Sequence, residues 1–82
     1  MQSRQMTDSW DVHVEVEGSN IIVTLPSTKF MVTYQKLTDA PQLRSKPDWT
    51  DDPDAGVTFG EFRARAWIAA KAKARELGWD VS

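Results

Sequence analysis

The stretch that decides the fold is VHVEVEGSNIIVTL, which spans residues 12–25. Valine alternates with polar residues at its start, and this period of two is typical of a strand with one buried face. Gly18 and Ser19 then supply a two-residue turn with glycine at its first central position. In antiparallel register this turn places apolar residues opposite one another, in the pairs Val16–Ile21, Val14–Val23 and Val12–Leu25. The sequence therefore predicts a hairpin whose apolar side chains share one face.

A third strand is expected at residues 28–36, which are rich in β-branched and aromatic residues. Residues 26–27, Pro-Ser, suit the centre of a second tight turn, because proline presets φ for the first central position. The register that follows continues the apolar face with the pairs Val23–Phe30 and Ile21–Val32. We thus expect strands over residues 11–17, 20–25 and 28–36, after a polar, flexible N-terminal segment over residues 1–10.

The period of the apolar residues changes to that of a helix in the last third of the chain. Thr58 and Glu61 have the spacing of a capping box, Val57 stands where a hydrophobic staple begins, and Gly78 suits the position after a helix end. A helix over residues 58–77 places its apolar stripe along Phe59, Phe62, Ala66, Ala70 and Leu77. The predicted fold class is α+β: a three-stranded antiparallel sheet with one C-terminal helix packed on one face.

Residues 37–56 form a long acidic connection between the last strand and the helix. Gln42 to Ser45 could add a short edge segment to the sheet. The carboxylates at Asp48, Asp51, Asp52 and Asp54 match an EF-hand loop only in part, because Thr50 replaces the usual first Asp and Ala55 the required Gly. Glu61 is already needed by the capping box, so we expect these acids to complement the helix N-terminus and bind no metal.

Length and composition indicate one small globular domain over residues 1–82, with 40% hydrophobic residues and a net charge of −2. No cysteine is present, and the longest apolar run, residues 67–70, is far too short to cross a bilayer. We expect a cytoplasmic protein that does not insert into membranes. His13 is the single histidine and no nucleophile motif surrounds it, so we expect no catalytic residues, no cofactor and no enzyme.

The helix carries a local excess of positive charge, from Arg63, Arg65, Lys71, Lys73 and Arg75. Three strands followed by one helix also resemble, in topology, DNA-binding domains of plant transcription factors and the arm-binding domains of integrases. Those domains read DNA with Arg and Trp on the exposed sheet face, where this chain has His13, Glu15 and Glu17, with Lys29 as the one fixed cation. Because the helix cations also encircle the helix, nucleic-acid binding is an alternative that the pattern disfavours.

Leftover apolar residues point instead to a protein partner or a homodimer. The chain has four tryptophans, and tryptophan favours interfaces that are apolar at one end and wet at the other. Ile68 lies opposite the core stripe, beside small alanines, and Ile22 and Met31 share the second sheet face. The candidate partner-binding residues are Ile22, Met31, Trp49, Ala64, Ile68, Ala72 and Arg75. The leading hypothesis is a non-enzymatic protein-interaction or self-associating module; the alternatives are nucleic-acid binding and a small metal-binding protein or enzyme.

Overall fold

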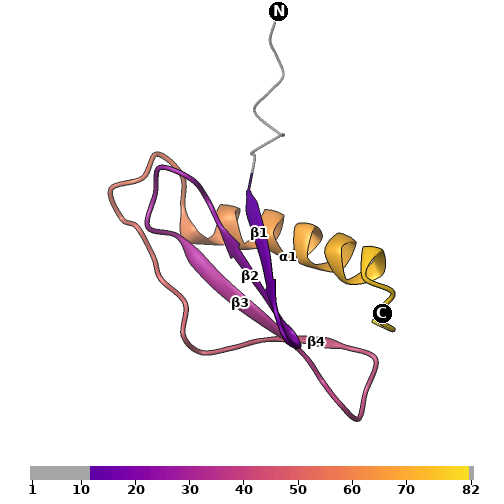
Figure 1. The fold of residues 1–82 in the computed structure, drawn as a ribbon. Helices are drawn as coiled ribbons and strands as arrows, with labels where there is room; N and C mark the ends of the chain where they lie inside the picture. The colour runs from indigo at the N-terminus through magenta and orange to yellow at the C-terminus, as the bar shows by residue number, and fades with distance from the viewer. Residues whose placement is uncertain (1–11, 82) are drawn as a thin grey trace, which may run out of the picture.

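The computed structural model describes residues 12–81, so the expected flexible segment 1–10 and the start of the first strand at residue 11 lie outside the described residues. The elements are β1 (His13–Glu17), β2 (Asn20–Thr24), β3 (Met31–Lys36), β4 (Leu43–Ser45) and α1 (Phe59–Glu76). The strands form one antiparallel sheet in the order β1-β2-β3-β4, and α1 lies across one face of it (Figure 1). The α+β class is confirmed, and the edge segment that the sequence suggested at residues 42–45 brings the number of strands to four.

The first hairpin has the predicted register, with Val14 opposite Val23 and Val16 opposite Ile21. Gly18 has a φ of 60°, in the left-handed region that glycine adopts without steric cost. Ile21 and Val23 are completely buried because β2 is an inner strand and α1 packs mainly on it.

The predicted register between the second and third strands is wrong by two residues. Val23 lies opposite Val32, where we expected Phe30, and Ile21 lies opposite Tyr34. The tight turn exists, since the Thr28 N–H donates to the Leu25 carbonyl over 3.1 Å, but residues 28–30 continue as a loop before β3 begins. A shift of two residues leaves each side chain on its predicted face, so the core keeps the expected members.

Helix α1 begins with the predicted capping box. The Thr58 hydroxyl accepts the Glu61 N–H at 3.1 Å, and the Glu61 carboxylate accepts the Thr58 N–H at 3.0 Å. Phe62 is buried at its start and stacks on Phe30, with ring centroids 5.0 Å apart. Three alanines continue the buried stripe, at Ala66, Ala70 and Ala74.

The expected place of Leu77 in this stripe is wrong. The helix ends at Glu76, so Leu77 occupies the C-cap and is 41% exposed. Gly78 then takes a φ of 80°, and the Trp79 N–H donates to the Ala74 carbonyl over 2.8 Å. This turn brings Trp79 back against the core, where it takes the packing role expected of Leu77.

The acidic connection, expected as a loop over residues 37–56, follows the free edge of β3. After β4 it leaves the ladder and pairs again at Thr50, which exchanges two backbone hydrogen bonds of 3.1 and 2.9 Å with Met31. Asp52 is buried, and its carboxylate accepts the Lys29 N–H at 3.0 Å. The connection thus runs beside β3 from β4 to the residues that precede α1. Within residues 12–81, no helix combines the length and hydropathy needed to cross a membrane.

Candidate functional site

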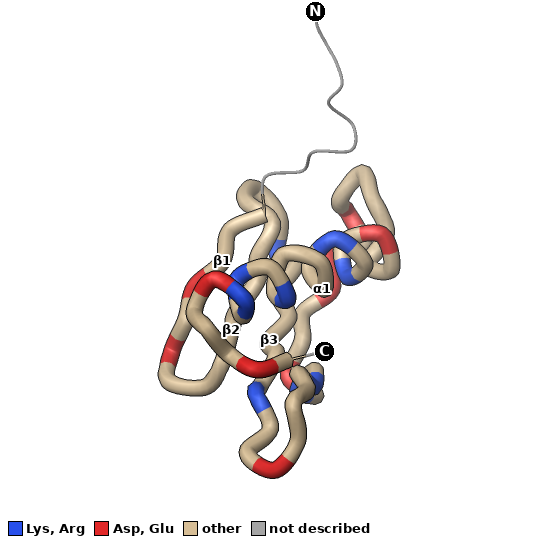
Figure 2. The backbone as a smooth tube through the Cα atoms, turned by 90° about the vertical axis from the view of Figure 1, so that its right-hand side faces the viewer, with Lys and Arg blue, Asp and Glu red and all other residues tan. Residues whose placement is uncertain are grey.

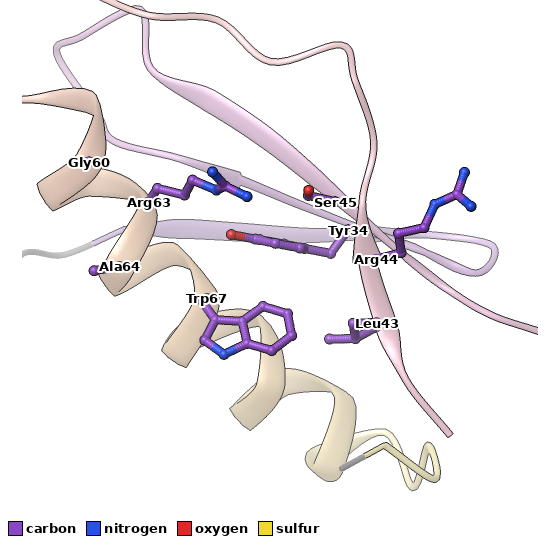
Figure 3. Close-up of a pocket in the computed structure, with 8 residues that line it drawn as sticks. All are labelled: Tyr34, Leu43, Arg44, Ser45, Gly60, Arg63, Ala64 and Trp67. Carbon is purple, nitrogen blue, oxygen red and sulfur yellow. The ribbon is translucent and has the colours of Figure 1, made fainter. Parts of the chain in front are cut away.

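A groove of about 610 Å³ lies between α1 and the β4 edge of the sheet, and we call it the edge groove (Figure 3). Its lining residues come from β3, β4 and the flank of α1: Tyr34, Leu43, Arg44, Ser45, Gly60, Arg63, Ala64 and Trp67. The groove exists because α1 packs mainly on the inner strand β2, so its flank does not fully cover the added edge strand.

Strand register and helical spacing bring the lining residues together. Tyr34 on β3 lies opposite Ser45 on β4, so both side chains share the face that α1 covers. Arg63 and Trp67 are four residues apart on α1 and therefore lie one above the other on one flank of the helix. The small residues Gly60 and Ala64 leave room beside them.

The Tyr34 hydroxyl is the most unusual group in the groove. Tyr34 is only 2% exposed, and its hydroxyl oxygen is buried without a hydrogen-bond partner in the described part of the chain. Figure 3 shows the hydroxyl end of the ring directed toward α1, with the Arg63 side chain reaching past it toward Ser45. Burial raises the pKa of the Tyr34 phenol, and the positive charge of Arg63 opposes that rise. The phenol is therefore a neutral donor at physiological pH.

Arg63 and Trp67 form the helix side of the groove. Arg63 is exposed and makes no ion pair with any carboxylate among residues 12–81. Trp67 packs on Tyr34 with ring centroids 5.4 Å apart at an angle of 57°, and the Lys71 amine lies 5.5 Å from the Trp67 ring. The groove thus combines an aromatic floor with a cation that pairs with no carboxylate among residues 12–81.

A second hollow of about 370 Å³ adjoins the edge groove and shares Ser45 and Arg63 with it; we call it the side recess. Trp49 and Phe59 line the side recess and stack on each other, with ring centroids 4.6 Å apart. Lys46 also lines this recess. Neither hollow has an aspartate or glutamate among its lining residues. The charged side chains that line the two hollows, Arg44, Lys46 and Arg63, are therefore all positive, in a chain whose net charge is negative.

The seven candidate residues from the sequence fall on three separate surfaces. Ala64 lines the edge groove, and Trp49, 51% exposed, lines the side recess. Ile68, Ala72 and Arg75 lie on the solvent face of α1, where Ile68 is 68% exposed. Ile22 and Met31 are half-buried on the sheet face away from α1. The structure therefore joins only Ala64 and Trp49 to one site.

Sequence reasoning missed the groove residues Tyr34, Ser45, Arg63 and Trp67. The available signal was helical phase, which places Arg63 and Trp67 beside the core stripe. No sequence pattern shows that the Tyr34 hydroxyl lacks a partner, because that depends on β4 and α1 meeting around it.

The other charged groups form no comparable site. Cations are spread along α1 (Figure 2), and their helical spacing distributes them around the helix, so they do not share one face. Lys73 pairs with Glu76 at 2.9 Å, and Lys71 lies over Trp67. His13 contacts Glu15 at 3.4 Å on an exposed strand. Among residues 12–81, no three His, Cys, Asp or Glu side chains gather as metal ligands do.

Comparisons of this chain with protein-family models, with curated proteins and with solved structures find no match.

Proposed function

We propose that this chain is a non-enzymatic protein-interaction module that binds a segment of a partner protein in the edge groove. The observation that carries the proposal is the buried Tyr34 hydroxyl, which faces the groove without a hydrogen-bond partner among the described residues. A buried polar group without a partner costs about 1–3 kcal/mol in folding free energy, so a ligand that supplies the partner recovers part of that cost.

The composition of the groove supports a protein partner. Tyr, Trp and Arg are the residue types that carry most of the binding energy in protein interfaces, and Tyr34, Trp67 and Arg63 meet here. The groove is open to solvent, whereas sites for small molecules enclose most of the ligand surface. One wall is an edge strand, which is a surface that extended segments of other proteins commonly join.

Selection from a library of random peptides displayed on phage tests this proposal. We expect peptides that bind the wild-type chain and lose binding to Trp67→Ala, because that variant removes the aromatic wall. Ile68→Ala is the matched control, since it truncates an apolar side chain on the same helix, one residue away but on the solvent face. Circular dichroism and thermal melting verify that both variants fold. Failure to enrich any binder, or binders that Trp67→Ala retains, would contradict the proposal.

A further inference from the structure

We infer that the partner segment is an extended peptide that adds to β4 as a fifth strand and places a carboxylate side chain beside Arg63 and Tyr34. This inference rests on the proposed function and specifies its ligand. It combines three observations: the unpaired edge of β4, the two donors that face the groove, and the absence of acidic lining residues.

The pairing of β4 with β3 shows which peptide groups of β4 point away from β3. The Leu37 N–H donates to Gln42 and the Lys46 N–H donates to Thr33, at 3.1 and 2.8 Å. Hydrogen-bonded pairs alternate along an antiparallel ladder, so Arg44 is the next residue that bonds to β3. The peptide groups of Leu43 and Ser45 consequently point away from the sheet, toward an incoming strand.

The chain itself limits how long such a strand can be. Pro41 and Pro47 bracket β4, and proline offers no N–H for continued pairing. The edge therefore accepts a short extended segment, with specificity coming from the side chains that enter the groove at every second position.

The polar groups in the groove select a carboxylate. Arg63 is a pure donor and the neutral Tyr34 phenol has an O–H to donate, so both are satisfied by an acceptor. A carboxylate accepts several hydrogen bonds at once and forms bidentate pairs with arginine. On either side of it, Trp67 with Leu43 and Trp49 with Phe59 favour apolar side chains.

A second copy of this chain supplies a carboxylate in only one of its two possible orientations on β4. Its own free edge strand, β1, has Val14 and Val16 on the face that α1 covers and its glutamates on the other face. Adding β1 to β4 with both α1 helices on one side of the joined sheet turns valines toward Arg63, whereas the reverse orientation turns the β1 glutamates there. We commit to an acidic segment of a different protein as the occupant, and a dimer of the free protein would count against it.

Two matched phage libraries test whether binding needs the carboxylate. One has a fixed central glutamate and the other a fixed central glutamine, and all other positions are random in both. We expect the glutamate library alone to yield strong binders. A selected peptide should bind about tenfold more tightly than its glutamine twin, as is typical of a charge-assisted hydrogen bond. That difference should vanish in Arg63→Gln and persist in Arg75→Gln, which makes the same charge change on the solvent face.

N-methylation of the selected peptide tests strand addition. In antiparallel pairing, the residues whose side chains enter the groove also turn their N–H groups toward β4. We expect an N-methyl group on the glutamate to abolish binding and one on the next residue to leave it intact. Equal success of the two libraries, or equal effects of the two N-methyl groups, would overturn this inference and leave the proposed function standing. Failure to enrich a binder from these two libraries and from the fully random library would remove both.

Discussion

The Tyr34 hydroxyl sets the proposed binding function against stability within one side chain. It is buried between β3 and α1 without a partner among residues 12–81, so the folded protein loses the hydration of this group and gains no hydrogen bond for it. Its ring nevertheless packs on Trp67 and forms the floor of the groove. The ring thus belongs to the core, whereas the hydroxyl is the group that the proposed ligand engages.

Tyr34→Phe should therefore stabilise the free protein while it weakens peptide binding. We expect the free energy of unfolding to rise by about 1 kcal/mol and the melting temperature by about 5 °C, because the unpartnered hydroxyl is removed. Urea unfolding and calorimetry measure the first effect, and titration with a selected peptide measures the second. A destabilised Phe variant would mean that the hydroxyl has a partner in solution.

The same variant has a pH signature. Burial raises the pKa of Tyr34, so the folded state holds its phenolic proton more tightly than the unfolded state does. Stability from this source is complete below the ordinary tyrosine pKa near 10 and falls as pH rises above it. Unfolding curves at increasing alkaline pH should therefore show a loss of stability that is smaller in Tyr34→Phe.

At the scale of the elements, the capping box fixes where α1 begins and so where Arg63 and Trp67 stand relative to β4. Hydrogen bonds from the Thr58 backbone and hydroxyl lower the pKa of Glu61. A lowered pKa contributes stability above the ordinary glutamate range, and this contribution is lost as pH falls through the folded pKa.

Thr58→Ala should cost about 1 kcal/mol of unfolding free energy at neutral pH, because the Glu61 N–H loses its acceptor. The variant should also lose less stability than the wild type between neutral and acidic pH, since the pKa of its Glu61 is closer to the unfolded value. Urea titrations at pH 7 and below pH 4 measure both effects. An equal loss of stability at acidic pH in the two proteins would show that the capping box does not lower the pKa of Glu61.

The elements also show how far sequence reasoning reaches. The register of the first hairpin and the start of α1 depend on local signals, Gly18 with Ser19 and Thr58 with Glu61, and the structure confirms both. The β2–β3 register depends on a distant group, because Asp52 accepts the Lys29 N–H from 23 residues away and holds the loop before β3 open. The edge groove forms where β3, β4 and α1 meet. The sequence shows its individual residues, but it does not show that they lie together.

At the scale of the whole molecule, the exposed apolar residues are scattered. Ile68 lies on the solvent face of α1 among alanines and charged residues, and Ile22 and Met31 lie on the other side of the sheet. A stable dimer generally buries about 800 Å² on each partner, and a single exposed isoleucine contributes only a small part of that. These surfaces do not combine into one self-complementary patch.

We accordingly expect light scattering across a concentration series to give the mass of a monomer, 9.3 kDa. A selected peptide at saturation should leave one protein chain per complex, because strand addition at β4 occupies a single edge. A concentration-dependent dimer would contradict this expectation. Ile68→Asp would then test the solvent face of α1, and Met31→Asp the outer sheet face.

The position of α1 in the chain has a consequence for synthesis on the ribosome. Within residues 12–81, α1 is the element that covers the apolar face of the sheet, and it follows all four strands. At about 5–20 residues per second, several seconds separate the emergence of β3 from that of the complete helix. During this interval Ile21, Val23 and Val32 face solvent in the nascent chain. The protein is therefore most open to chaperones, and to aggregation with neighbouring nascent chains, just before its helix emerges.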